Sequence, residues 1–281
     1  MQRIFIFGLG YTAKRIGAAL AALGCEVVST GRDGTLRFGD AGTVRLALAD
    51  ASHVLSSVPP EGSGGDPVLD SYGDTLTGKR LIYLSSTGVY GDTGGAWVDE
   101  SAAIGTGRRT ARAEADNAWL ALGARVLRLP GIYGPGRSAL ERVQAGAAQR
   151  IDLPGQVFSR VHVNDIVSAA LLALNGPEGA YNIADDLPCR QNAVIAEACR
   201  LLGVAPPPLR SLEEADLSPM ARGFYAENRR VANGKARRVL GWLPRYPTFV
   251  EGLRACLGGD SAMTSPASAS AAPPAASIDQ R

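Results

Sequence analysis

Short apolar runs alternate with helical stretches through the first half of the chain. An apolar run over residues 3–7 leads through a glycine-containing turn into a helical pattern over residues 13–23. Further strand-like runs and one more helical pattern follow, at residues 26–30, 53–58, 80–85 and 124–129 for the strands and 108–122 for the helix. Strands that alternate with helices are typical of a parallel sheet covered on both faces. The pattern therefore predicts an α/β fold with a Rossmann-type, doubly wound parallel sheet.

The spacing of the elements changes in the second half of the chain. Helical patterns cover residues 163–174 and 192–202, and a strand-like run over residues 180–183 lies between them. We expect a Rossmann domain over residues 1–150 and a smaller lobe over residues 151–257. The lobe is expected to be partly interleaved with the first domain and to cover the carboxyl edge of the sheet, where ligands of such folds bind.

A glycine-containing string joins the first predicted strand to the first predicted helix. Gly8 permits a tight turn there, Gly10 lets a ligand approach the backbone, and Ala13 lets the helix pack closely on the strand. The first turn of the helix offers free N–H groups and a positive dipole end to an anion. A turn that binds nothing is the alternative, but the strand–turn–helix context favours a dinucleotide diphosphate. The predicted cofactor loop is Gly8, Leu9, Gly10, Tyr11, Thr12 and Ala13.

The end of the second predicted strand bears on the choice of cofactor. A carboxylate at this place would bind the ribose hydroxyls of NAD and repel a 2′-phosphate. The strand instead ends with Ser29, Thr30 and Arg32, and the first carboxylate is that of Asp33. The Arg32 guanidinium fits a 2′-phosphate, so we favour NADP over NAD. A solvated Arg32 in a loop is the alternative.

Composition narrows the class of protein. The chain has 29 basic and 27 acidic side chains and a net charge of +2, so we expect no nucleic-acid partner. No apolar run is long enough to span a bilayer, and no signal-peptide pattern occurs. Four scattered cysteines and two histidines predict neither disulfides nor a metal site. We therefore expect a cytoplasmic protein that acts on a small molecule. The Ser-, Ala- and Pro-rich residues 258–281 predict a disordered tail.

Four strings beyond the glycine turn occur in a characteristic order. They are LSSTGVYG at residues 84–91, RLPGIYGPGR at residues 128–137, RVHVNDI at residues 160–166 and GWLPRY at residues 241–246. With the glycine turn, they resemble the extended short-chain dehydrogenase/reductase superfamily, of the NAD-dependent epimerase/dehydratase kind. The chain is similar in particular to a divergent bacterial subgroup, and the resemblance covers roughly residues 1–255.

The resemblance implies roles for the residues at matching positions. Ser86 would be the catalytic Ser/Thr that polarises the substrate oxygen. Further cofactor contacts are implied for Asp40 at the adenine amine, for Ser57, Val58, Pro59 and Ser85 at the ends of the central strands, and for Pro130, Gly131 and Ile132 beside the nicotinamide.

The sequence departs from the family pattern at the catalytic Tyr-x-x-x-Lys pair. Arg108 occupies the tyrosine position and Arg112 the lysine position. Because a guanidinium does not deprotonate in proteins, Arg108 cannot serve as a general acid or base. Arg112 could still hold the ribose hydroxyls. The alternative is that Arg108, Arg112 and Asp116 are exposed charges on one helix face, at a spacing of four residues.

Other polar residues of the motifs are candidates for substrate contacts. Tyr90 and Tyr133 could instead be packed tyrosines with a local hydrogen bond. His162 is the imidazole nearest the second lobe, and Arg160 could hold a phosphate or carboxylate. Together with Thr87, these are the substrate candidates.

Two functions remain open from the sequence. The first is an NADP- or NAD-dependent oxidoreductase or epimerase-like enzyme that acts on a small carbonyl or sugar-like compound. The second is a nucleotide-responsive binding protein that kept the pocket and lost turnover. By analogy with the family, the helix over residues 108–122 is a candidate homodimer surface.

Overall fold

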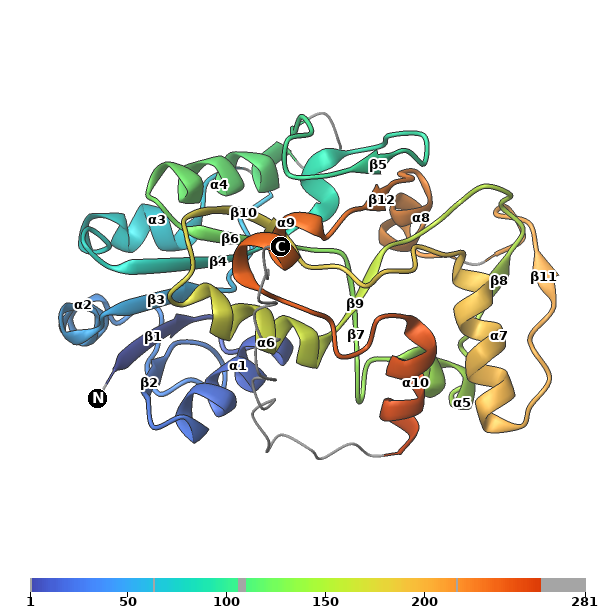
Figure 1. Ribbon diagram of the computed structural model, residues 1–281, viewed down its shortest axis with the longest axis horizontal. Helices are drawn as coiled ribbons and strands as arrows, with labels where there is room; N and C mark the ends of the chain where they lie inside the picture. Colours follow the sequence, from blue (N-terminus) through green and yellow to red (C-terminus); the bar gives the residue numbers. More distant parts are fainter. Residues whose placement is uncertain (1, 63, 106–109, 216, 259–281) are drawn as a thin grey trace, which may run out of the picture.

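The computed structural model describes residues 2–62, 64–105, 110–215 and 217–258 (Figure 1). Arg108 and nearly all of the segment predicted as a disordered tail lie outside these residues.

Six parallel strands form the central sheet. In the order of the sheet they are β2 (Glu26–Ser29), β1 (Arg3–Phe7), β3 (His53–Ser56), β4 (Arg80–Ser86), β6 (Arg125–Leu129) and β10 (Gly179–Asn182). Every neighbouring pair is parallel, which confirms the predicted doubly wound α/β fold. The strand order reverses between β1 and β3, and ligands of such sheets bind at the carboxyl ends of the strands beside this point.

Alternating side chains of the strands fill two cores. In β1, Ile4 and Ile6 enter one core and Phe5 and Phe7 the other, because successive strand residues point to opposite faces. The first core is covered by α1 (Tyr11–Ala22), α6 (Val163–Ala173) and α9 (Gly234–Leu240). The second is covered by α2 (Ala41–Asp50), α3 (Pro67–Tyr72) and α4 (Thr110–Ala121). The chain after residue 150 therefore supplies a sheet strand and two covering helices.

A smaller lobe stands beyond the carboxyl edge of the sheet (Figure 1). It contains α5 (Ala139–Gln144), α7 (Gln191–Leu202), α8 (Pro219–Tyr225) and α10 (Phe249–Leu257). Three of these helices, α5, α7 and α10, pack around a separate apolar cluster that includes Leu140, Val194 and Leu253. Three short parallel strand pairs complete the fold: β7 (Gly131–Tyr133) with β9 (Arg160–His162), β8 (Arg150–Ile151) with β11 (Leu209–Arg210), and β5 (Trp97–Val98) with β12 (Arg230–Val231).

Candidate active site

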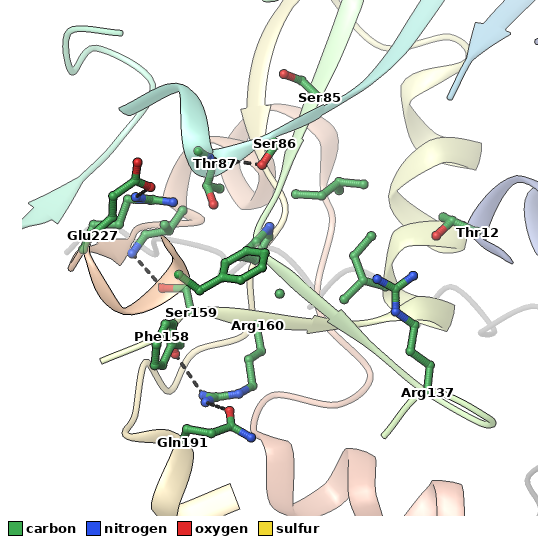
Figure 2. Close-up of a pocket in the computed structure, with 18 of the residues that line it drawn as sticks. Thr12, Ser85, Ser86, Thr87, Arg137, Phe158, Ser159, Arg160, Gln191 and Glu227 are labelled. Atoms are coloured by element: carbon green, nitrogen blue, oxygen red, sulfur yellow. Dashed lines mark hydrogen bonds and ion pairs between the residues drawn. The ribbon is translucent and has the colours of Figure 1, made fainter. Parts of the chain in front are cut away.

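A cleft of about 670 Å³ runs from the first turn of α1 into the smaller lobe. Its sheet side is lined by residues 10–13, by Ser57, by the end of β4 and by Pro130, Gly131 and Ile132. Its far side is lined by residues of the lobe, including Phe158, Arg160 and Gln191 (Figure 2). The structure therefore brings the predicted glycine loop, the predicted catalytic serine and the predicted nicotinamide loop together in one cavity.

The turn after β1 is held in place by its neighbours. Gly8 has φ +80°, and a Cβ at this position would lie 3.0 Å from both Ser57 Oγ and Val58 Cγ2. Ser57 Oγ donates a hydrogen bond to the Gly8 carbonyl, and Leu9 N donates to the Thr30 carbonyl at 2.9 Å. Only glycine combines this φ with this close approach. The turn thus sits at the point where the strand order reverses.

The start of α1 is open to a ligand. Its N-cap residue, Gly10, provides no side-chain hydrogen bond. Four other helices, α2, α3, α5 and α10, are capped by Asp40, Asp66, Ser138 and Thr248, whereas α7 and α9 also lack a side-chain cap. A Cβ at Gly10 would meet no atom within 4 Å, so the backbone borders open space there. Free N–H groups beside open space fit the diphosphate of a dinucleotide.

The residues predicted around the adenosine end lie outside the lining of the cleft. Asp40 caps α2, and its Oδ2 accepts the Thr43 hydroxyl at 2.8 Å. Ser29 and Thr30 are buried, whereas Arg32 and Pro59 are exposed. The Asp33 carboxylate pairs with Lys14, and this hydrogen bond lowers the pKa of Asp33. Of the polar side chains expected near a 2′-phosphate, Arg32 is the one that faces solvent.

The hydroxyls at the carboxyl end of β4 point in different directions. Ser86 Oγ accepts the Gly88 N–H at 3.1 Å, which leaves the hydroxyl proton for donation toward the cleft. Figure 2 shows Ser86 and Thr87 on the cleft side of the strand end and Ser85 pointing away. Ser85 Oγ instead donates to Asp116 Oδ2 at 2.7 Å. Ser86 is therefore the serine placed to contact a ligand.

A buried polar network lies behind Ser85. Arg128 Nη2 donates to Asp116 Oδ1 at 2.7 Å, and Arg128 Nη1 donates to the Tyr90 hydroxyl at 2.9 Å. The Tyr90 hydroxyl then donates to Asn182 Oδ1 at 2.8 Å. Asp116 is fully buried, so the interpretation of Arg108, Arg112 and Asp116 as three exposed charges is wrong for Asp116. Its carboxylate faces the sheet because it pairs with an arginine of β6.

Arg112 lies on the same helix and borders the cleft. Its Nη1 donates to the Tyr83 hydroxyl at 3.0 Å, and Tyr83 stacks on Trp119. Burial raises the pKa of Tyr83 to about 12. The hydrogen bond holds Arg112 at the cleft wall. Arg108, the residue at the family's tyrosine position, lies outside the described residues.

Three substrate candidates are packed into the protein interior and do not line the cleft. Burial raises the pKa values of both Tyr90 and Tyr133. Tyr133 donates to the Thr248 carbonyl at 3.4 Å. His162 is 1% exposed, and its Nδ1 accepts the Asn164 N–H at the start of α6. The centre of its ring also lies 4.2 Å from the centre of the Tyr246 ring.

Arg160 lines the cleft, but its guanidinium donates hydrogen bonds to other groups of the protein. It is 6% exposed, and Nη1 donates to the Phe158 carbonyl at 2.9 Å. Nη2 donates to Gln191 Oε1 at 2.9 Å, as Figure 2 shows. These bonds hold the Arg160 guanidinium in place against the smaller lobe.

Several residues that line the cleft are not among the candidates that the sequence predicts. They come from loops and short elements of the lobe, and they are Arg137, Phe158, Gln191, Tyr225 and Glu227. Glu227 is 9% exposed, and its Oε2 lies 2.9 Å from Arg229 Nη1. Only the GIYGPGR string, which contains Arg137, gave a signal that could have identified one of them.

The described residues contain neither a membrane-spanning helix nor a cluster of metal-ligating side chains. Within residues 2–258, apart from the gaps given above, no helix is long and apolar enough to cross a membrane. The same residues contain no group of three or more His, Cys, Asp or Glu side chains that could hold a metal ion.

Solved structures of other proteins share this fold. No protein-family model matches the chain. dTDP-glucose 4,6-dehydratase from Bacillus anthracis, solved with NAD, is 17% identical with a TM-score of 0.72, over 92% of this chain and 96% of that one. UDP-glucose 4-epimerase from Thermus thermophilus, also solved with NAD, is 21% identical with a TM-score of 0.69, over 94% and 100%. The chain has the same fold as these two enzymes.

More similar sequences define the family within this class. A conserved protein of unknown function from Silicibacter pomeroyi has a solved structure with a TM-score of 0.82 and 38% identity, over 92% of this chain and 99% of that one. The chain belongs to the family of that protein. Protein YeeZ from Escherichia coli K12 is 28% identical, over 88% of this chain and 97% of its own. A 3-diazoavenalumate denitrifying reductase from a Streptomyces species is 35% identical, over 46% of this chain and 45% of its own.

Proposed function

We propose that this protein binds a nicotinamide dinucleotide, NADP in preference to NAD, and transfers hydride between it and a small carbonyl or sugar-like compound. The observation that carries the proposal is the cleft itself. It joins an uncapped helix start, the Ser86 hydroxyl and the Pro130–Ile132 loop in one cavity. The NAD complexes of proteins with this fold and the reductase among the relatives support the same class of reaction.

Each part of the cleft has a role in this proposal. Residues 10–13 would hold the diphosphate, and Arg112 would contact the nicotinamide ribose. The bound nicotinamide supplies the hydride or accepts it. Ser86 would donate its hydroxyl proton as a hydrogen bond to the substrate oxygen, which stabilises negative charge that develops there. Thr87 and the lobe residues Phe158, Arg160 and Gln191 would shape the pocket for the substrate.

The preference for NADP rests on Arg32. This guanidinium follows β2 and is exposed, and the carboxylate next to it, Asp33, is neutralised by Lys14. A 2′-phosphate near the end of β2 would therefore meet a cation, with the neighbouring negative charge already compensated.

A nucleotide-responsive protein without turnover is the second candidate. The arginine at the family's lysine position, Arg112, favours this candidate. Arg112 lies on α4, and this helix contains no tyrosine whose pKa it could lower. In either function we expect a cytoplasmic protein, and the helix over residues 108–122 remains the proposed homodimer surface.

Binding and turnover measurements separate the two candidates. Titration with NADPH and NADH should show binding of both, with NADPH about tenfold tighter. The Arg32→Gln variant should lose this difference and bind NADH as the wild type does. Carbonyl compounds are then screened for consumption of the reduced cofactor. Tight binding without turnover on any class of compound would favour the nucleotide-responsive protein, and the absence of binding would refute both.

A further inference from the structure

The loop between β7 and α5, which leads into the smaller lobe, places a guanidinium beside the first turn of α1. Arg137 follows β7 in the loop that leads to α5, and it lines the cleft together with Tyr11 and Thr12. Its Cζ lies 5.6 Å from the centre of the Tyr11 ring. Figure 2 shows the side chain directed toward the side of the cleft that carries Thr12. A cation thus lies next to the glycine loop at the wall of the cleft.

The loop that carries Arg137 is anchored on α1. The Tyr11 hydroxyl donates to the Pro135 carbonyl at 3.1 Å, and Arg15 Nη2 donates to the same oxygen at 3.3 Å. A Cβ at Gly134 would lie only 2.7 Å from the Tyr11 hydroxyl, so this close approach requires glycine. The backbone before Arg137 therefore has little freedom relative to the glycine loop.

The other side of the loop is fixed by Glu141. The N–H groups of Gly136 and Ser138 donate to its two carboxylate oxygens, each at 2.7 Å. Ser138 and Glu141 together form a capping box at the start of α5. Both oxygens of the Glu141 carboxylate are therefore used by the loop itself, and the backbone that carries Arg137 is held in place before any ligand arrives.

Arg137 differs from the other cations near the start of α1. Lys14 pairs with Asp33, and Arg15 lies over the Tyr11 ring and donates to the Tyr11 carbonyl at 3.0 Å. In the described part of the chain, Arg137 forms no ion pair. It is also exposed, so its charge is not spent on the fold. Its charge borders the same cavity as the backbone N–H groups of the first turn of α1.

We infer that Arg137 is a ligand of the cofactor diphosphate, which it holds together with the N–H groups of α1. This inference rests on the proposed function and adds to it a residue that the glycine motif does not contain. A guanidinium forms paired, charge-assisted hydrogen bonds with phosphate oxygens, and its planar donors suit a diphosphate better than a lysine would. Because Arg137 belongs to the loop that leads to α5, the bound dinucleotide ties the sheet to the lobe.

Equilibrium binding to the full chain tests the inference. The proteins are the wild type, Arg137→Gln, Arg137→Lys and Arg254→Gln, and the last of these removes an exposed charge from α10, outside the cleft. The probes are NADPH, NADH and ADP-ribose, which all contain the diphosphate, and adenosine 2′-monophosphate, which lacks it. Arg137→Gln should weaken binding of the three diphosphates by a common factor of about tenfold or more. It should leave adenosine 2′-monophosphate unchanged, and the lysine variant should lose less.

The outcomes separate this inference from the proposed function. If the wild type binds NADPH and Arg137→Gln binds it equally well, Arg137 is not a diphosphate ligand, although the proposed function stands. The same holds if the variant weakens only NADPH, or only the affinity for a carbonyl substrate. If the wild type binds no dinucleotide, both proposals fail. Equal thermal unfolding midpoints of the wild type and the variant show that the loss arises at the site, and Arg254→Gln should bind all probes as the wild type does.

Discussion

Asp116 of α4 and Arg128 of β6 form an ion pair in the protein interior. Asp116 Oδ1 and Arg128 Nη2 are 2.7 Å apart, and the two side chains are 0% and 4% exposed. The remaining bonds of both groups go to Ser85 and Tyr90. The pair joins the helix that carries Arg112 to the strand that leads into the nicotinamide loop, so it positions two walls of the cleft.

Removing one partner of this pair should destabilise the protein strongly. In Asp116→Ala, the Arg128 guanidinium stays buried without its carboxylate, which typically costs about 3–5 kcal/mol. The free energy of unfolding in urea measures the loss. The control is Asp74→Ala, which breaks the exposed pair of Arg45 and Asp74 and should leave the midpoint unchanged. Equal effects of the two variants would contradict the role of the buried pair.

The two glycines of the cofactor loop should respond differently to substitution. Gly10 has an ordinary φ of −88° and borders open space, so Gly10→Leu should fold as the wild type does. Its side chain would fill the place of the diphosphate, and NADPH binding should weaken by about a hundredfold or more.

Gly8→Ala is the matched comparison. It adds a single methyl group at φ +80°, against Ser57 and Val58, so it should lower the unfolding midpoint. Calorimetric melting and NADPH titration of both variants provide the check. If Gly10→Leu retains full affinity, the diphosphate does not bind at this turn.

Ser86 and Ser85 should separate catalysis from stability. The Ser86 hydroxyl faces the cleft, so Ser86→Ala should lower kcat by about 10²-fold while the affinity for NADPH stays the same. Ser85 donates to buried Asp116, so Ser85→Ala should lower stability and affect kcat much less. Steady-state kinetics on any carbonyl compound that the screen identifies, together with urea unfolding, measures both. An unchanged kcat in Ser86→Ala would remove Ser86 from the mechanism.

A buried carboxyl group should make stability depend on pH. Burial raises the pKa of Asp185 to about 7, and its Oδ2 has no hydrogen-bond partner in the described structure. Between about pH 4 and pH 7, the folded protein therefore keeps a proton that the unfolded chain releases, so the contribution of Asp185 to stability falls as the pH rises.

The variant Asp185→Asn isolates this effect. It cannot ionise, so its unfolding midpoint should match that of the wild type near or below pH 4 and exceed it near pH 8. Asp165, whose pKa is also raised by burial, to about 6, is present in both proteins. Its negative charge contributes to the raised pKa of Asp185, so that contribution is part of the measured difference. A variant that is less stable than the wild type at the higher pH would contradict this prediction. It would show that attraction to the Arg160 charge stabilises the Asp185 carboxylate by more free energy than burial costs it.

The strands of the sheet and the glycine loop could be predicted because their signals are local. An apolar run such as residues 3–7, followed by Gly8 and Gly10, contains both the strand and the reason for the turn. The boundaries of α1, α6 and α7 also follow the periodicity to within a few residues.

The pairings inside the site could not be predicted in the same way. Asp116 follows Arg112 by four residues, a spacing that also fits an exposed helix face, and its burial depends on Arg128 in a different element. His162 gives no sign in the sequence that its ring caps α6 and lies between Tyr133 and Tyr246. Arg137 enters the cleft only because Tyr11 and Pro135 bring its loop onto α1.

The position of β10 affects how the protein is made. Residues 179–182 form the outermost strand beside β6, although more than forty residues of lobe and loop separate the two in the chain. In a nascent polypeptide leaving the ribosome, the edge of β6 that pairs with β10 stays unpaired until this late segment is synthesised. The unpaired N–H and C=O groups of such a strand edge can pair with strands of other chains. Translation of the intervening stretch is therefore the period in which a chaperone would protect the protein most.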